Sequence, residues 1–477
     1  MSGATEHPGA SGAESVERFG YRQELSRSLT FRDLLVYGLV FMVPIAPFGI
    51  FGAVYSGSGG MVALAYAIGM AAMAFTALSY SEMARAFPMA GSVYTYAGRG
   101  LAPAVGFMAG WLILLDYVLV PSLLYLIAGL AISSFVPAVP LWAWIVFFIV
   151  VNTGINYLGI QMTARVSLVM LALELVVLAI FLVIGIGALI GGAGQGFSLD
   201  PLYNPDTFSL GLVFSAVSIA VLSFLGFDGI STLAEENRQG ARIVGRAMVA
   251  ALVVAGTLFI VQTWVAALLV PDPAALLSEG DAEGTAFYEA AAAAGGEWLS
   301  VLTAVTTAIA WGFANALVAQ VATSRLLFAM ARDRQLPRFL AHVSQNHHVP
   351  DRAILLVAAV SLVVGVYMAS RDDAVTLLST LVNFGALTAF LLLHASVINH
   401  YMRREGQSVM RHLVAPLCGL LIIAYVIIQA DVAAQTLGLV WLALGAVVLV
   451  ALYASGRRPE LAGMGHDTTG GDDDRRA

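Results

Sequence analysis

Three acidic side chains lie inside long apolar stretches of the sequence, where a charge is unfavourable. Asp228 lies in the stretch SFLGFDG at residues 223–229, near the centre of an apolar run that begins near residue 210. Asp116 and Glu174 lie within two other apolar runs. A carboxylate at the centre of a bilayer costs at least ~3 kcal/mol, and ionisable residues at that depth mark functional sites by default.

These residue types indicate two kinds of chemistry. We interpret Asp116 and Asp228 as partners for the ammonium group of a substrate or as proton carriers, and Glu174 as a proton carrier. The alternative for each residue is structural. The two aspartates could accept hydrogen bonds from neighbouring helices, and Glu174 could remain neutral in an apolar interior.

The elements that hold these residues are membrane helices. The 477 residues are 59% hydrophobic and 11% charged, whereas a soluble domain is about 25% charged. We therefore expect an all-α, multi-pass membrane protein with about twelve helices, since ~20 apolar residues span a bilayer. The runs lie at residues 32–56, 61–86, 103–134, 141–161, 166–190, 210–234, 247–270, 299–330, 353–369, 374–401, 412–429 and 434–454.

The arginines predict the orientation of this bundle. All basic residues are arginine, so Schiff-base chemistry on a lysine is excluded. With the N-terminus inside, every arginine except Arg371 falls on the inner side, as the positive-inside rule requires. This pattern predicts a plasma (inner) membrane protein with cytoplasmic tails at 1–28 and 456–477 around a transport domain at 29–455. The acidic loop 271–298 is expected outside.

Two of the predicted helices are interrupted. The first run contains Pro44, Pro47, Gly49 and Gly52, and the sixth contains the SFLGFDG stretch. Proline removes a backbone donor and glycine tolerates unwound backbone. Breaks in helices 1 and 6, five helices apart, indicate a substrate site between inverted repeats, here at 32–190 and 210–401 with extra helices at 412–454. The alternative is a proline kink and a packing glycine.

The predicted substrate site combines the two breaks with polar residues from other helices. Phe224 and Phe227 flank the second break as a hydrophobic gate or as core aromatics. Asn315 shares a helix face with Trp311, and Asn383 with Ser379; such groups also serve as interhelical hydrogen bonds. The predicted substrate-binding residues are Ala46, Pro47, Gly49, Phe51, Asp116, Ser223, Phe224, Gly226, Phe227, Asp228, Asn315 and Asn383.

Charges at the predicted cytoplasmic helix ends suggest a gate. Glu82 and Arg85 lie three residues apart at the end of the second run, and Glu235 and Glu236 are expected to face the arginines at 238–246. We expect this network to close when the cavity opens outward, the alternative being solvated helix ends. The predicted gate residues are Glu82, Arg85, Glu235, Glu236, Arg242 and Arg246.

Three sequence blocks carry a resemblance to a known family. They are residues 78–117, including FPMAGSVYTY at 87–96; residues 223–231, followed by Glu235, Glu236 and the arginines at 242 and 246; and NFGAL at 383–387. Over about 29–455 the chain resembles the amino acid–polyamine–organocation transporter superfamily, and specifically its bacterial putrescine-importer-like branch. The resemblance implies a LeuT-like fold with a 5+5 inverted repeat.

One residue departs from the pattern of that branch. The resemblance implies an aspartate in the broken part of helix 1 of putrescine importers, where this sequence has Gly49. A diamine needs anions at both ends, whereas an amino acid needs N–H donors for its carboxylate, which a half-helix N-terminus supplies. The substitution weakens the putrescine interpretation and leaves amino acids open.

We therefore predict a secondary active importer of an amino acid or polyamine that works by alternating access with a co-transported proton. Sodium coupling, an exchanger and a non-transporting sensor remain alternatives. No ATP-binding or hydrolase motif occurs, so we expect no enzyme activity and no cofactor. The histidines at 342, 347 and 348 lack cysteine or spaced carboxylate partners, so no metal site is expected. The expected partners are the small-molecule substrate and the lipid bilayer, without nucleic acid.

Overall fold

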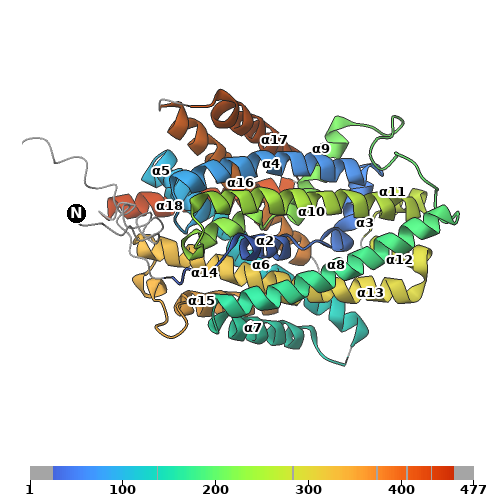
Figure 1. Cartoon of the computed structure of the whole chain (residues 1–477), viewed down its shortest axis with the longest axis horizontal. Helices are drawn as coiled ribbons and strands as arrows, with labels where there is room; N and C mark the ends of the chain where they lie inside the picture. Colours follow the sequence, from blue (N-terminus) through green and yellow to red (C-terminus); the bar gives the residue numbers. More distant parts are fainter. Residues whose placement is uncertain are drawn as a thin grey trace, which may run out of the picture.

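The computed structural model describes residues 25–136, 138–281, 284–371, 374–403, 407–430 and 432–455, and its regular structure is helical (Figure 1). One isolated bridge joins Leu29 to Asn237. All of the predicted C-terminal tail 456–477 and most of the tail 1–28 lie outside the described residues.

The predicted helix count agrees with the structure. Ten helical spans in the described part of the chain are long and apolar enough to cross a bilayer, α2 and α3 together form an eleventh, and α7 is a shorter apolar helix. The helices are α2 (Phe31–Met42), α3 (Pro47–Gly57), α4 (Val62–Ala86), α5 (Ser92–Gly100), α6 (Pro103–Phe135), α7 (Leu141–Tyr157), α8 (Ile160–Ile190), α9 (Leu210–Ala220), η1 (Val221–Phe224), η2 (Phe227–Glu236), α10 (Ala241–Leu269), α11 (Pro273–Glu279), α12 (Ala286–Gly295), α13 (Glu297–Ile309), η3 (Ala310–Asn315), α14 (Ala316–Arg332), η4 (Arg338–Ala341), α15 (Asp351–Met368), α16 (Ala374–Met402), η5 (Met410–Val414), α17 (Ala415–Gln429) and α18 (Val432–Ala454).

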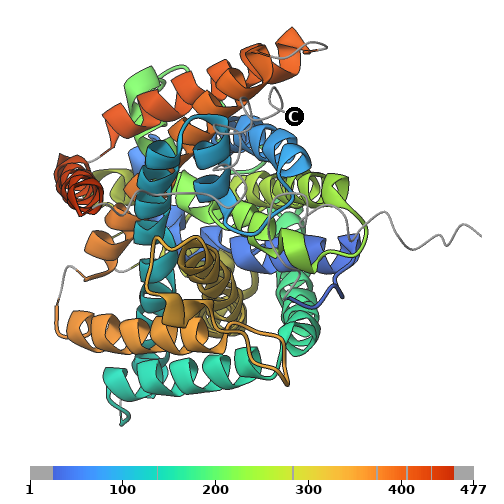
Figure 2. The same cartoon turned by 90° about the vertical axis from the view of Figure 1, so that its left-hand side faces the viewer.

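The outer surface of the bundle is apolar along its length. Val183, Val363 and Val440 are 72%, 70% and 61% exposed. Exposed aliphatic side chains on regular helices are what a bilayer requires, because backbone groups are satisfied within each helix. Figure 2 shows α7 and α15 side by side along one edge, and these helices pack against each other. The protein is therefore a multi-pass membrane protein.

Helix 1 is broken between α2 and α3, as predicted, but its pivot is not a glycine. The two axes differ by 54°. Val43 has φ 53°, a conformation that is costly for a β-branched residue. Pro47 occupies the first turn of α3, where its missing N–H costs nothing. Gly49 and Gly52 therefore lie inside α3 rather than in the unwound segment.

Helix 6 unwinds at its predicted centre. α9 ends at Ala220 and is followed by the short 3₁₀ turn η1, an extended Leu225, and Gly226 with φ 119°. A Cβ on Gly226 would lie 2.8 Å from the ring of Phe41. Glycine is required here by both the backbone conformation and the close approach of α2.

The two broken helices lie against each other. α2 packs on η2 and α3 packs on α9, so the two breaks face one another in the middle of the bundle. The same spacing of five helices recurs in three further packed pairs, α4 with α10, α6 with α14, and α7 with α15. This packing places α6, η2 and η3 around the breaks.

Candidate functional site

A small cavity lies where the two breaks meet α6 and η3. About 40 Å³ of it is open to the centre of a water molecule, room for a few waters but not for an amino acid. The site is therefore closed in this conformation. The residues around it are Phe41, Met42, Ala46, Ile50, Asp116, Val120, Leu123, Leu124, Leu222, Ser223, Leu225, Gly226, Trp311 and Asn315.

Five of the predicted substrate-binding residues line this cavity: Ala46, Asp116, Ser223, Gly226 and Asn315. Among the described residues of the lining, Asp116 provides the only carboxyl group, and it is 2% exposed. It forms no hydrogen bond or ion pair with any residue that the structure describes. An unpartnered carboxyl group in an apolar cavity becomes a strong attractor for a cation once it is ionised.

Two further polar atoms of the lining have no protein partner. Trp311 Nε1 and Asn315 Oδ1 are buried and form no hydrogen bond with the described residues. Both belong to η3, a π-helical turn, and such turns often occur at functional sites. Asn152 holds this turn by donating to the carbonyl of Gly312 at 3.1 Å. The cavity thus offers one carboxyl group, one donor and one acceptor.

The other residues predicted from the two breaks lie outside the lining. Gly49 faces the indole of Trp311, and a Cβ there would lie 3.3 Å from it. Phe51 contacts Phe287 and Tyr55. Pro47 begins α3, Phe224 packs against Tyr66 and Phe259, and Phe227 packs against Tyr80 and Phe390.

Asp228 is fully buried behind the cavity wall rather than in it. Its carboxylate accepts a hydrogen bond from the Tyr117 hydroxyl at 2.6 Å and one from the Gly226 N–H at 3.3 Å. These bonds fix the unwound backbone of helix 6 against α6. Asn383 is also outside the lining, and its amide donates to the carbonyl of Ser218 on α9 at 3.3 Å.

Glu174 lies on α8 with 1% exposure, away from the cavity lining. Neither of its carboxylate oxygens has a hydrogen-bond partner among the residues described. An isolated carboxylate charge in such surroundings costs several kcal/mol. Glu174 therefore differs from Asp228, whose oxygens are bonded.

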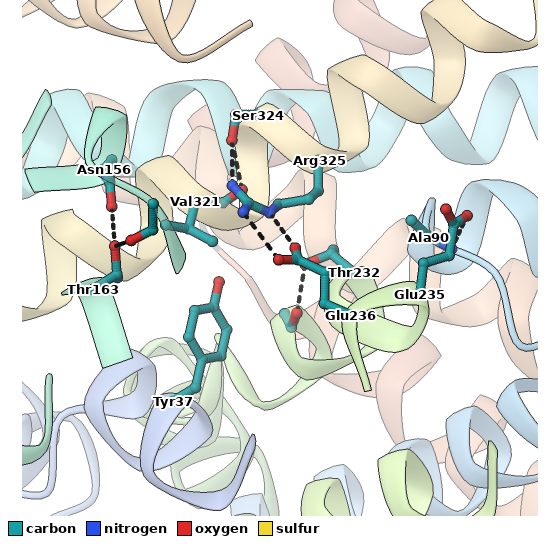
Figure 3. A network of polar contacts seen from close by, with 12 residues as sticks. Tyr37, Ala90, Asn156, Thr163, Thr232, Glu235, Glu236, Val321, Ser324 and Arg325 are labelled. Atoms are coloured by element: carbon teal, nitrogen blue, oxygen red, sulfur yellow. Dashed lines mark hydrogen bonds and ion pairs between the residues drawn. The ribbon is translucent and has the colours of Figure 1, made fainter. Parts of the chain in front are cut away.

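A buried network of ion pairs closes one end of the site (Figure 3). The Arg325 guanidinium lies 2.8 Å from Glu236, and both side chains are at most 1% exposed. Glu235 binds Arg332 at 2.7 Å and accepts the Ala90 N–H at 3.0 Å. The network connects η2 with α14 and with the loop before α5.

The predicted partners of these glutamates are wrong. Arg242 and Arg246 lie on α10, exposed and without an ion pair among the described residues. Both α10 and α14 pack on η2, but Arg242 and Arg246 lie on the exposed face of α10, whose buried face carries Val244. Glu82 and Arg85 do pair, at 3.1 Å, but outside the buried network, with Arg85 36% exposed.

The segment before α2 belongs to the same closure. The N–H groups of Ser28 and Leu29 donate to the Glu236 carbonyl at 3.1 and 3.0 Å. The Tyr37 hydroxyl donates to the Val318 carbonyl of α14 at 2.8 Å. The segment before α2 is thereby tied to η2, and the middle of α2 is tied to α14.

Aromatic rings close the opposite end. Phe287 of α12 stacks on Phe48 of α3 with ring centroids 3.9 Å apart, and contacts Phe51 and Phe181. Asp281 accepts N–H bonds at the start of α12, including one from Thr285 at 2.9 Å. This aromatic cover contains no ion pair among the described residues.

Several residues of the site were missed in the sequence. Arg325 lies in an apolar helix and carries the signal that identified the three acids, an intramembrane charge. Arg332, at the end of the same helix, carries a weaker version of that signal. Trp311 was recognised only as a neighbour of Asn315 on one helix face, because sequence alone does not show which face lines a cavity. The apolar residues of the lining, such as Phe41 and Leu225, resemble other apolar residues of membrane helices, so no sequence pattern marks them as part of a site.

Known proteins with similar sequences are transporters. The model of the family described as amino acid permease matches residues 34–455. The low-affinity putrescine importer PlaP of Escherichia coli K12 is 32% identical over 446 residues, 92% of this chain and 96% of that protein. An uncharacterized transporter of Mycobacterium bovis is 30% identical over 456 residues, 95% and 96% of the two chains. The branched-chain amino acid permease BcaP of Bacillus subtilis is 25% identical over 463 residues, 89% and 93%.

Proposed function

This chain belongs to the amino acid permease family of membrane transporters, and from that premise we propose that it imports an amino acid or amine whose ammonium group binds Asp116. The observation that carries the proposal is the Asp116 carboxylate, which lines the cavity between the two helix breaks without a partner among the described residues. A substrate cation would pair with this buried carboxylate, and ionisable residues inside a membrane protein need such a partner.

The same cavity supports an amino acid with an apolar side chain over a diamine. Trp311 Nε1 can donate to a substrate carboxylate, and Asn315 Oδ1 can accept from its ammonium. The rest of the lining is mainly aliphatic and aromatic, and no second carboxylate is present in it. A diamine would leave one ammonium group without an anion. Among relatives, one is named for putrescine and another for branched-chain amino acids.

We place the cytoplasm at the end closed by Arg325 and Arg332. This orientation puts both termini inside and follows the arginine distribution. Alternating access then requires the η2–α14 ion pairs to part when the site opens inward, and the aromatic cover to part when it opens outward. The protein is placed in the plasma (inner) membrane.

The proton gradient is the proposed driving force, with Glu174 as the carrier. Glu174 lies outside the substrate cavity, and neither of its oxygens is hydrogen-bonded to a described residue. Hydrogen bonding from the surrounding protein therefore fixes neither its protonated nor its ionised form. Asp116 is assigned to the substrate and Asp228 to the support of Gly226, although either aspartate was also a candidate proton carrier.

The test is uptake of radiolabelled leucine, isoleucine and putrescine into proteoliposomes, with and without an inward proton gradient. We expect gradient-driven accumulation of the amino acids. Asp116→Asn should reduce uptake at least ~100-fold, since it removes a buried charge from the substrate cation. Asp200→Asn, an exposed control, should leave uptake unchanged. Full uptake by Asp116→Asn would overturn the assignment, and putrescine accumulation alone would overturn the amino acid preference.

A second pair of variants separates coupling from binding. Glu174→Gln should abolish accumulation against a gradient while preserving exchange of internal for external substrate. Asp228→Asn should abolish both, because the Tyr117 and Gly226 bonds that support the break would weaken. Uptake that depends on internal substrate in the unaltered protein would identify an exchanger instead.

A further inference from the structure

A second, larger hollow lies on the other face of α6. It is a groove of about 590 Å³ bordered by α6, the end of α14, η4, α15, α16 and α18. Leu115 and Leu119 face this groove, while Asp116 and Val120 line the substrate cavity. The groove opens to the membrane side, where Val440 is 61% exposed. One stretch of α6 therefore separates the two hollows.

Among the described residues that line the groove, no side chain has a free hydrogen-bonding group. Trp111 and Trp441 are the polar side chains among them, and each indole N–H donates to the other residue's carbonyl at 2.9 Å. Their rings stack with centroids 4.5 Å apart. Gly445 permits this contact, because a Cβ there would collide with the Trp111 ring. A molecule inside the groove must be hydrocarbon where it touches the wall.

Three arginines, in contrast, lie next to lining residues of the groove along the chain. Arg334 precedes the lining segment 336–340, Arg338 lies within that segment, and Arg352 is four residues before the lining residue Leu356 on α15. All three arginines are exposed, and none forms an ion pair with a described residue. The acids beside them are engaged, Asp333 by Tyr94 at 2.7 Å and Asp351 by His342 at 2.7 Å.

We propose that the groove binds one acyl chain of an anionic phospholipid, whose phosphate contacts Arg334, Arg338 and Arg352. The apolar channel fits the acyl chain of such a lipid, and basic residues at one membrane surface fit its phosphate. Trp111 and Leu119 are about 12 Å apart along α6, close to the ~15 Å depth of one hydrocarbon leaflet. A second copy packed on this groove by two-fold symmetry would cover the apolar wall but would bring its own arginines, and not an anion, to these arginines.

The proposal is tested with the full-length protein in phosphatidylcholine vesicles that contain a trace of phosphatidylglycerol with a diazirine in one acyl chain. After irradiation, labelled residues are mapped by mass spectrometry. We expect label concentrated on residues 111–119 of α6 and 437–444 of α18. Unlabelled phosphatidylglycerol should displace it more effectively than phosphatidylcholine.

A charge variant tests the headgroup contact. Arg338→Gln with Arg352→Gln should reduce the preference for phosphatidylglycerol by about fivefold for each arginine removed. Arg165→Gln with Arg411→Gln, which removes two exposed arginines elsewhere, should preserve the preference. Both double variants alter only exposed side chains, so each should remain folded, which size-exclusion chromatography would check.

Two results would overturn the proposal. Label spread evenly over the outer faces of α7 and α15, with equal displacement by both lipids, would show ordinary bilayer contact. Crosslinks between α18 segments of two protein copies, with the groove unlabelled, would identify a second copy as the occupant.

Discussion

The two ends of the closed site are covered by different chemistry. At the η2–α14 end, the buried pair of Arg325 and Glu236 joins two helices. At the α3–α12 end, Phe287 stacks on Phe48 without any ion pair among the described residues. Both covers exclude water from one cavity, but parting a buried ion pair exposes two charges that must be solvated, whereas parting rings exposes only apolar area.

This difference suggests that opening the two ends has different free-energy costs. The ion-pair end opens only if water or substrate charge replaces the lost partners, which suits a side that opens after substrate has bound. At the aromatic end, the cost of opening is set by the apolar surface area that becomes exposed. The following variants, ordered from the largest expected effect, test that contrast.

The largest effect is expected from Arg325→Ala. The substitution leaves Glu236 buried without its partner, which costs about 3–5 kcal/mol of folding stability. Thermal unfolding of the purified protein measures this loss. The double variant Arg325→Met with Glu236→Leu should restore stability to within about 1 kcal/mol, because the charges leave together. A stable single variant would show that the pair is not a structural cover.

Phe287→Ala should have the next largest effect, roughly 2–4 kcal/mol on the docking of α12, since each aromatic pair contributes about 0.5–1.5 kcal/mol. The measurement is the reactivity of Ser223→Cys, a cavity position, towards an impermeant maleimide after the native Cys418 is replaced by serine. Reactivity should rise. Phe208→Ala, an exposed control, should not raise it; equal reactivity in both variants would contradict the aromatic cover.

Gly226→Ala tests the break in helix 6, which lies between the two covers. A positive φ costs a non-glycine residue about 1–3 kcal/mol, and the added Cβ would approach Phe41. We expect lower thermal stability and slower uptake. Gly154→Ala on α7, where a Cβ meets no atom within 4 Å, is the matched control and should be neutral or stabilising. A neutral Gly226→Ala would place the hinge elsewhere.

The smallest effect is expected from Arg85→Gln. The Glu82 pair is partly exposed, and such pairs contribute about 0–1 kcal/mol. Unfolding temperature and uptake should both stay near those of the unaltered protein. A loss comparable to that of Arg325→Ala would show that Glu82 and Arg85 belong to the gate, as the sequence had suggested.

The sequence by itself determined which segments enter the membrane and where two of them break. Apolar length, arginine placement, Pro47 and Gly226 are local properties, and the bilayer converts them directly into spans and interruptions. The three buried acids were also visible, because a charge in an apolar run stands out without any knowledge of packing.

Only the tertiary structure decided what each of these residues faces. Consecutive residues of a helix point about 100° apart, so the rotation set by packing places Asp116 in the cavity, Asp228 behind it and Glu174 in a separate apolar interior. Packing of α14 on η2 likewise gave Glu236 its partner Arg325, which lies 89 positions away along the chain. Partners at that separation leave no local pattern, and the sequence could not assign them.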